Sequence, residues 1–234
     1  MITVDVLDTL NLDDIKEFIK FHSGLDVDKL DKFLLSPKEQ DKQFKGEQPY
    51  VMIAGGVLLD FLLEQTPKDI DIFTSSTTLD EQLIDHLKDL GFKVTFNSPQ
   101  VITMKLVDEA NFMAPIQIIL RPERKYQSPQ ELLSSFPFAV TAIGYNLLTQ
   151  QISRTKAFEQ SVEFEYIEYG DINKTNCISA IPRLIKYSRK TGFLPSKRAI
   201  EAIVYVIRNM SEEDLHSELD YVMTKDSNTA GGLY

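Results

Sequence analysis

Two aspartates, Asp69 and Asp71, lie two positions apart in the run KDIDIF of this 234-residue sequence. In an extended strand, side chains two positions apart point to the same face, so the two carboxylates come close together. Neighbouring carboxylates repel each other, and a divalent cation that prefers oxygen ligands, Mg²⁺ or Mn²⁺, relieves this repulsion. The pair therefore predicts a metal site held by Asp69 and Asp71.

A pair of glycines, Gly55 and Gly56, precedes the aspartates and separates an apolar run from a helix-compatible segment. Glycines let the backbone come close to a ligand, and a helix N-terminus offers free N–H groups to a phosphate. A phosphate cradle beside two metal-binding acids is what nucleotidyl transfer needs, because one metal activates the attacking hydroxyl and another steadies the leaving pyrophosphate. Either feature alone is typical of a turn or a solvated strand edge, but their order and spacing favour the chemical interpretation.

Short elements must position these residues. The apolar run 50–54 predicts a buried strand, residues 57–63 are compatible with a helix, and Thr66-Pro67 breaks that helix. Residues 70–73 alternate as a strand with one polar face would. The glycines and the aspartates are thus expected on two strands joined by one helix.

Further elements are expected on both sides of this unit, and the chain becomes helical towards its end. They are a helix over 12–20 capped by Asn11, a helix over 79–90 closed by Gly91, strands over 92–96, 101–107 and 116–120, a hairpin turn at 108–111, a short helix over 129–133, a hairpin of 139–148 with 151–155, and helices over 181–191, 197–208 and 212–223. This order favours an α+β sheet domain followed by helices.

The composition is that of a globular chain with an acidic excess. Hydrophobic residues make up 43%, and the formal net charge of −10 argues against a general nucleic-acid coat protein. Residues 172–200 nevertheless contain no acidic residue and seven basic ones, which indicates a phosphate-bearing partner for this segment. No stretch approaches the roughly 20 apolar residues that cross a bilayer. The N-terminus lacks a secretory signal, and the single Cys177 forms no internal disulfide, so we expect a cytoplasmic location and no membrane partner.

The segment AGGVLLDFLLEQTPKDIDIF (54–73) resembles the motif of the polymerase β-like nucleotidyltransferase superfamily. It is similar above all to the branch of CCA-adding enzymes and bacterial poly(A) polymerases, and the run 116–146 also resembles uncharacterised nucleotidyltransferase-like proteins of phages and large DNA viruses. The resemblance covers residues 50–208. It implies a nucleotidyltransferase fold with a mixed β-sheet flanked by helices and a C-terminal helical neck. It also implies an NTP substrate, Mg²⁺ or Mn²⁺, tRNA or another RNA as an acceptor, and the host cytoplasm for a phage-encoded protein.

A second stretch, RLIKYSRKTGF (183–193), resembles the R-x-x-R-x-x-x-R-x-G-F helix that follows the catalytic domain in that branch. Arg183, Lys186 and Lys190 are spaced so that they share one helix face. The resemblance implies that these cations and Lys68 bind the nucleotide, with acceptor RNA close by. A solvated basic face is the alternative interpretation.

One position departs from the family pattern. Active members carry a third carboxylate on a later strand, which helps to bind metal and deprotonates the acceptor hydroxyl. The matching position here is Gln117, whose amide can ligate weakly but cannot act as a base. Asp108 and Glu109, at the expected hairpin tip, are alternatives that strand alternation does not place at the metal.

Two hypotheses remain open at this stage. The first is a Mg²⁺-dependent nucleotidyltransferase acting on a hydroxyl of RNA, protein or a small molecule. The second is a catalytically impaired nucleotide- or partner-binding protein on the same fold. We expect an N-terminal helical extension (1–48), a nucleotidyltransferase-like domain (49–170), a helical neck-like segment (171–224) and a flexible tail (225–234); the acceptor, the preferred NTP and the oligomeric state are left open.

Overall fold

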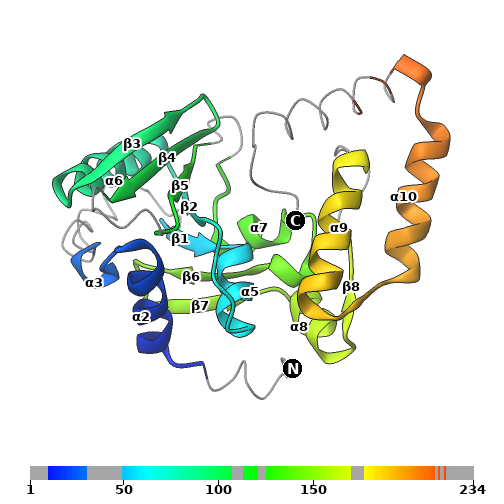
Figure 1. The fold of residues 1–234 in the computed structure, drawn as a ribbon, viewed down its shortest axis with the longest axis horizontal. Coiled ribbons are helices and arrows are strands. Elements are labelled where there is room, and N and C mark those ends of the chain that lie inside the picture. Colours follow the sequence, from blue (N-terminus) through cyan, green and yellow to red (C-terminus); the bar gives the residue numbers. More distant parts are fainter. Residues whose placement is uncertain are drawn as a thin grey trace.

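A computed structural model describes residues 10–30, 49–106, 113–120, 125–169 and 177–213, together with His216 and Leu219. A mixed sheet with helices packed on it forms the centre, and two long helices stand at one side (Figure 1). The expected α+β architecture, a mixed β-sheet flanked by helices, is therefore confirmed.

The central sheet has seven strands in the order β3-β4-β5-β2-β1-β6-β7. The β2–β5 pair is parallel, and the other neighbouring pairs of this sheet are antiparallel. The strands are β1 Val51–Ala54, β2 Ile70–Thr74, β3 Phe92–Asn97, β4 Val101–Leu106, β5 Ile116–Ile119, β6 Ile143–Asn146 and β7 Gln151–Arg154. The two strands that carry the motif residues, β1 and β2, thus lie inside the sheet rather than at its edge.

Polar side chains begin most of the longer helices by accepting a hydrogen bond from a backbone N–H of the first turn, which satisfies a donor that has no partner within the helix. These caps are Asn11, Ser76, Ser128, Thr155 and Ser196. The helices are α2 Leu12–Ser23, α3 Val27–Leu30, α5 Gly56–Leu62, α6 Thr77–Asp89, α7 Pro129–Ser134, α8 Lys156–Glu163, α9 Cys177–Thr191 and α10 Lys197–Asn209, with a 3-10 turn η2 at Ala139–Thr141.

The alternation along the inner strands divides the apolar residues between two cores. Val51, Ile53 and Ile72 point into the larger core, which α2, α5 and α6 also line. Met52 and Phe73 point to the opposite face, where α7 packs. Asp71 alternates with the residues of the larger core and therefore shares the face of Phe73. The acidic pair consequently lies on the less covered side of the sheet.

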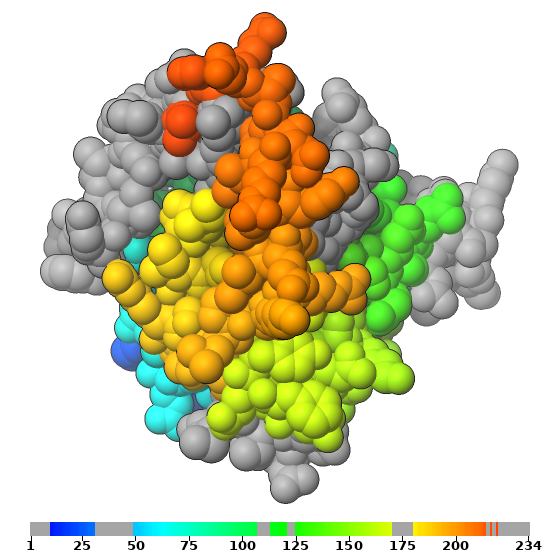
Figure 2. Space-filling view, turned by 90° about the vertical axis from the view of Figure 1, so that its right-hand side faces the viewer, coloured from blue at the N-terminus to red at the C-terminus, as the bar shows by residue number. Residues whose placement is uncertain are grey.

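The two long C-terminal helices, α9 and α10, run side by side at one end of the molecule (Figures 1 and 2). A small parallel pair of strands, β8 Tyr166–Ile167 and β9 Leu194–Pro195, ties the chain after α8 to the link between α9 and α10. Helix α9 therefore contacts α10 and both strands of this small pair.

Four local elements differ from the sequence-based expectation, and two of them are the short strands β8 and β9, which were not predicted. The strand expected from 139 begins only at Ile143, because Ala139–Thr141 forms η2, in which the Thr141 hydroxyl donates to the Phe138 carbonyl. Helix α8, capped by Thr155, was not predicted. The expected turn at 108–111, most of the helix at 212–223 and the tail at 225–234 lie outside the described residues.

Candidate functional site

The acidic pair lies where β2 begins. Asp71 is on β2, Asp69 immediately precedes it, and both are half-buried. Gln117 is the ladder partner of Asp71 in the parallel β2–β5 pair. Partners across a ladder point to the same face, so the Gln117 amide stands beside the Asp71 carboxylate.

Gly55 approaches this carboxylate from β1. Its φ of 91° lies in the region that favours glycine, and its N–H donates to the Ile143 carbonyl at 3.2 Å. A Cβ atom placed on Gly55 would lie 3.5 Å from the Phe136 ring and 4.0 Å from Oδ2 of Asp71. A Cβ atom on Gly56 would meet nothing within 4 Å. The glycine backbone is therefore open next to the acidic pair.

The donor set at this place suits a hard divalent cation. Asp69, Asp71 and the Gln117 carbonyl oxygen are all oxygen ligands, and Mg²⁺ accepts one or two carboxylates together with water and phosphate oxygens. Among the residues that the structure describes, no group of three or more His, Cys, Asp or Glu side chains is arranged to hold a metal ion. The described part of the site thus offers two carboxylates and one amide.

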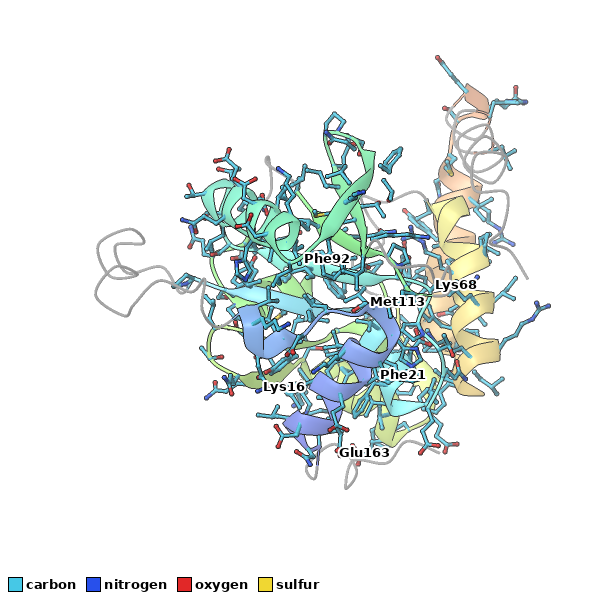
Figure 3. All side chains as sticks on the ribbon, turned by 60° about the vertical axis from the view of Figure 1, so that its left-hand side comes forward. Lys16, Phe21, Lys68, Phe92, Met113 and Glu163 are labelled. Carbon is cyan, nitrogen blue, oxygen red and sulfur yellow. The ribbon has the colours of Figure 1, made fainter. Side chains whose placement is uncertain are left out.

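Helix α9 brings positive charge to the same region. Lys190 forms an ion pair with Asp60 of α5, and both side chains are almost fully buried. Lys186 is exposed overall, but partial desolvation and the nearby charge of Lys190 lower its pKa, while Asp69 acts in the opposite direction. Lys68 also acts on Lys186, and Figure 3 shows Lys68 beside α9. Lys186 and Lys68 therefore bring positive charge near Asp69, and Lys190 lies close to Lys186 and Asp60.

An aromatic residue of α9 lies between these charges. The Tyr187 ring packs 5.2 Å from the Phe138 ring, measured between centroids, and the Lys186 ammonium lies 5.7 Å from the Tyr187 ring centroid. Burial raises the pKa of Tyr187 to about 12, and the charge of Arg183 opposes this rise. Asp71 acts in the same direction as burial. Tyr187 is therefore a neutral group within electrostatic reach of Asp69 and Asp71.

A second charged group lies buried at the far end of β2. Lys125 pairs with Asp80 at 2.7 Å, and its ammonium also donates to the Thr74 hydroxyl at 3.0 Å. The Thr74 hydroxyl donates in turn to Asp80. Burial raises the pKa of Asp80 and lowers that of Lys125, although each partner opposes the shift of the other. This network joins β2, α6 and the segment before α7.

The predicted site residues thus gather in two groups that face each other. Gly55, Asp71 and Gln117 come together on the sheet, and Gly56 and Asp69 adjoin them. Lys68, Lys186 and Lys190 belong to the second group, with Arg183 acting on Tyr187. Asp108 and Glu109 lie outside the described residues.

Sequence reasoning missed Asp60, Tyr187 and the Lys125–Asp80 pair. The sequence did contain a signal for Asp60, because Asp60 is the single charged residue in the apolar segment GVLLDFLL. A buried charge requires a partner. The partner itself, 130 residues later in the chain, leaves no local signal.

The chain is similar in fold to solved structures of CCA-adding enzymes and of a tRNA nucleotidyltransferase. An apo CCA-adding enzyme matches with a TM-score of 0.58 and 14% identity, over 93% of this chain and 49% of that chain. A CCA-adding enzyme with ATP matches with a TM-score of 0.57 and 17% identity, over 90% and 50%. A tRNA nucleotidyltransferase with a primer tRNA and an incoming ATP analogue matches with a TM-score of 0.54 and 15% identity, over 73% and 49%. The fold is accordingly that of the polymerase β-like nucleotidyltransferases, and the chain spans about half the length of these structures.

The particular family follows from the sequence match. Residues 26–165 match the model of the Gabija anti-defense 2 family, Gad2, and the chain belongs to that family. No curated protein matches the chain. Among the described residues, no helix has the length and apolar character that crossing a membrane requires.

Proposed function

We propose that this protein is a Mg²⁺-dependent nucleotidyltransferase that moves a nucleotidyl group from an NTP to a hydroxyl group, and that phages use this transfer against the Gabija defence named in its family. The observation that carries the proposal is the position of Gly55 beside Asp71, with Gln117 on the next strand. The nucleotidyltransferase fold and the cations of α9 support it.

Each residue has a defined part in the proposed reaction. Asp69 and Asp71 hold Mg²⁺ or Mn²⁺, with Gln117 as a neutral oxygen ligand. When bound, the metal supplies charge to the attacking and leaving oxygens. The backbone at Gly55 and Gly56 admits the triphosphate close to the sheet.

The chain's positive groups complete the proposed site. Lys186, Lys68 and Arg183 attract the triphosphate, because they place positive charge around the beginning of β2. The acceptor hydroxyl belongs to RNA, including a tRNA-like RNA, to a protein or to a small molecule. The acceptor hydroxyl must lose its proton during the transfer, and among the described residues no third carboxylate is placed to take that proton. We therefore expect slow transfer unless another group of the acceptor, or water, takes the proton.

Gln117 also favours a second candidate, a catalytically impaired nucleotide- or partner-binding protein on the same fold. A neutral amide beside Asp71 preserves oxygen ligation but removes the general base. In this case nucleotide binding persists without transfer.

Label transfer distinguishes the two candidates. Each α-labelled NTP is incubated with the protein, with Mg²⁺ or Mn²⁺, and with total RNA, protein or small-molecule extracts of the host. The test variant is Asp69→Asn/Asp71→Asn, and the matched control is Asp13→Asn/Asp14→Asn, which neutralises two exposed carboxylates of α2. If RNA, protein or a small molecule becomes labelled with the control but not with the test variant, the result supports nucleotidyl transfer and identifies the acceptor class. Nucleotide binding without label in any extract supports the impaired protein.

A further inference from the structure

Helix α5 carries one carboxylate among its apolar residues. Asp60 is 7% exposed and lies in the same helix as Val57, Leu58 and Leu59, which fill the larger core. Its partner, Lys190 of α9, is buried to a similar degree, with side-chain exposures of 10% for Asp60 and 11% for Lys190. A buried ion pair of this kind joins the helix that follows the glycines to the helix that carries the cations.

A second contact strengthens the same junction. The Gln65 side-chain amide, just after α5, donates to the Lys190 backbone carbonyl at 3.5 Å. The last turn of α9 is therefore held by α5 and the segment that follows it. Figure 2 shows residues of the α5 region along the edge of α9.

Burial makes this pair costly in free energy. It raises the pKa of Asp60 even though Lys190 acts to lower it, so desolvation outweighs the attraction between the partners. Buried ion pairs often add little stability and instead select one arrangement of the elements that they join. The elements that this pair joins are α5 and α9.

The neighbouring α9 lysine has a different environment. Lys186 lies one helical turn before Lys190, so the two share a face of α9. Its ammonium interacts with Asp69 as well as with Asp60 and remains at an exposed position. The charge of Lys190 is already balanced by the buried Asp60 carboxylate, whereas the exposed Lys186 ammonium is available to bind a polyphosphate.

We propose that Asp60 and Lys190 are positioning residues that seat α9 on α5 and thereby hold Lys186 beside Asp69, and that Lys190 does not itself contact the nucleotide. The part of this proposal that concerns the nucleotide rests on the proposed function. It divides the lysines of α9 between two tasks: Lys190 fixes the helix, and Lys186 meets the triphosphate.

A double-mutant cycle tests the division. The variants are Asp60→Asn, Lys190→Met and the two together, and the probe is an ATP analogue with a non-cleavable α–β bond in the presence of Mg²⁺. We expect each single change to weaken binding about tenfold, and the double change to weaken it no further, because both act through one contact. The control is Lys197→Met, which removes an exposed lysine paired with Glu201, and its dissociation constant should stay within about twofold of the wild type.

Additive effects would overturn the proposal. If Lys190→Met weakens binding by the same factor with and without Asp60→Asn, Lys190 contacts the ligand directly. The variant Lys190→Arg preserves a charged partner for Asp60 and should bind the analogue nearly as the wild type does. Should a single variant fail to fold, the double variant, which leaves no unpaired buried charge, and Lys190→Arg still provide the comparison.

Amide hydrogen exchange along α9 separates this proposal from the proposed function. Each single variant should accelerate exchange over residues 181–191, and the double variant should recover part of the protection. If the wild type binds no nucleotide but this pattern appears, the proposed function fails and the seating of α9 stands. If exchange in α9 is the same in all variants, the positioning role is wrong whatever the nucleotide does.

Discussion

The two motif glycines should respond differently to the same small change. Gly55→Ala adds a methyl group to a residue with φ of 91°, within 3.5 Å of the Phe136 ring. Gly56→Ala adds a methyl group within helix α5 to a residue whose φ is not in the left-handed region, with no atom within 4 Å. One change therefore strains the fold, whereas the other enters only the space that we assign to the triphosphate.

The expected changes in the free energy of unfolding follow from the backbone conformation, and the expected change in nucleotide affinity follows from the ligand contact. Gly55→Ala should lower the free energy of unfolding by ~1–3 kcal/mol because its backbone conformation is unfavourable for alanine. Gly56→Ala should leave it unchanged or raise it by ~0.5–1 kcal/mol because alanine favours a helix. If the methyl group of Gly56→Ala displaces one charge-assisted hydrogen bond worth about 1.5–3 kcal/mol, nucleotide binding weakens roughly 10- to 100-fold.

Urea unfolding and titration with Mg²⁺ and non-cleavable NTP analogues measure the two quantities separately. Gly56→Ala is expected to keep its stability and to lose nucleotide binding, which would exclude unfolding as the cause of the loss. A Gly56→Ala protein that binds every analogue within twofold of the wild type would refute the assignment of the glycines to the triphosphate.

Three further outcomes follow from the charged groups. Lys125→Met leaves the Asp80 carboxylate, whose side chain is 4% exposed, without its cation, so unfolding in urea should show a loss of ~3–5 kcal/mol, and adding Asp80→Asn should restore part of it. The folded-state pKa of Asp60 is raised, with Lys190 as its paired cation, so the contribution of Asp60 to stability is fully present below about pH 4 and declines as pH rises through the raised pKa. The stability difference between wild type and Asp60→Asn should accordingly fall with increasing pH above about pH 4, and a rising difference would contradict the burial argument. Gln117→Asp should raise Mn²⁺ affinity about tenfold or more in a titration and lower metal-free stability by on the order of 1 kcal/mol through like-charge repulsion; unchanged Mn²⁺ affinity would place the metal elsewhere.

The sheet around the motif could be predicted because its signals are local. The apolar run before Gly55 and the alternation around Asp71 each indicate a strand within a few residues, and both strands are present. The resemblance of the motif then supplied the mixed sheet flanked by helices, whereas the order of strands in the sheet was not predicted. The register that sets Gln117 beside Asp71 depends on pairing between distant segments and became visible only in the structure.

The missed elements depend on contacts that the sequence does not display. The run at 139–148 is mostly apolar, so its periodicity did not separate the η2 turn from the following strand. Helix α8 spans eight residues and buries Phe158 and Val162, too few apolar positions for a clear helical period. The Asp60–Lys190 pair joins residues 130 positions apart, and its two members gain their roles only when α9 packs against α5.

The most direct test of the central claim is a crystal structure of the protein grown with Mn²⁺ and a non-cleavable NTP analogue, with the anomalous signal used to locate the metal. We expect a Mn²⁺ peak bound by the carboxylates of Asp69 and Asp71 at about 2.0–2.4 Å, with the triphosphate against Gly55 and Gly56 and the Lys186 ammonium turned towards it. Mn²⁺ and nucleotide bound together at another place, with Asp69 and Asp71 free of metal, would contradict the central claim.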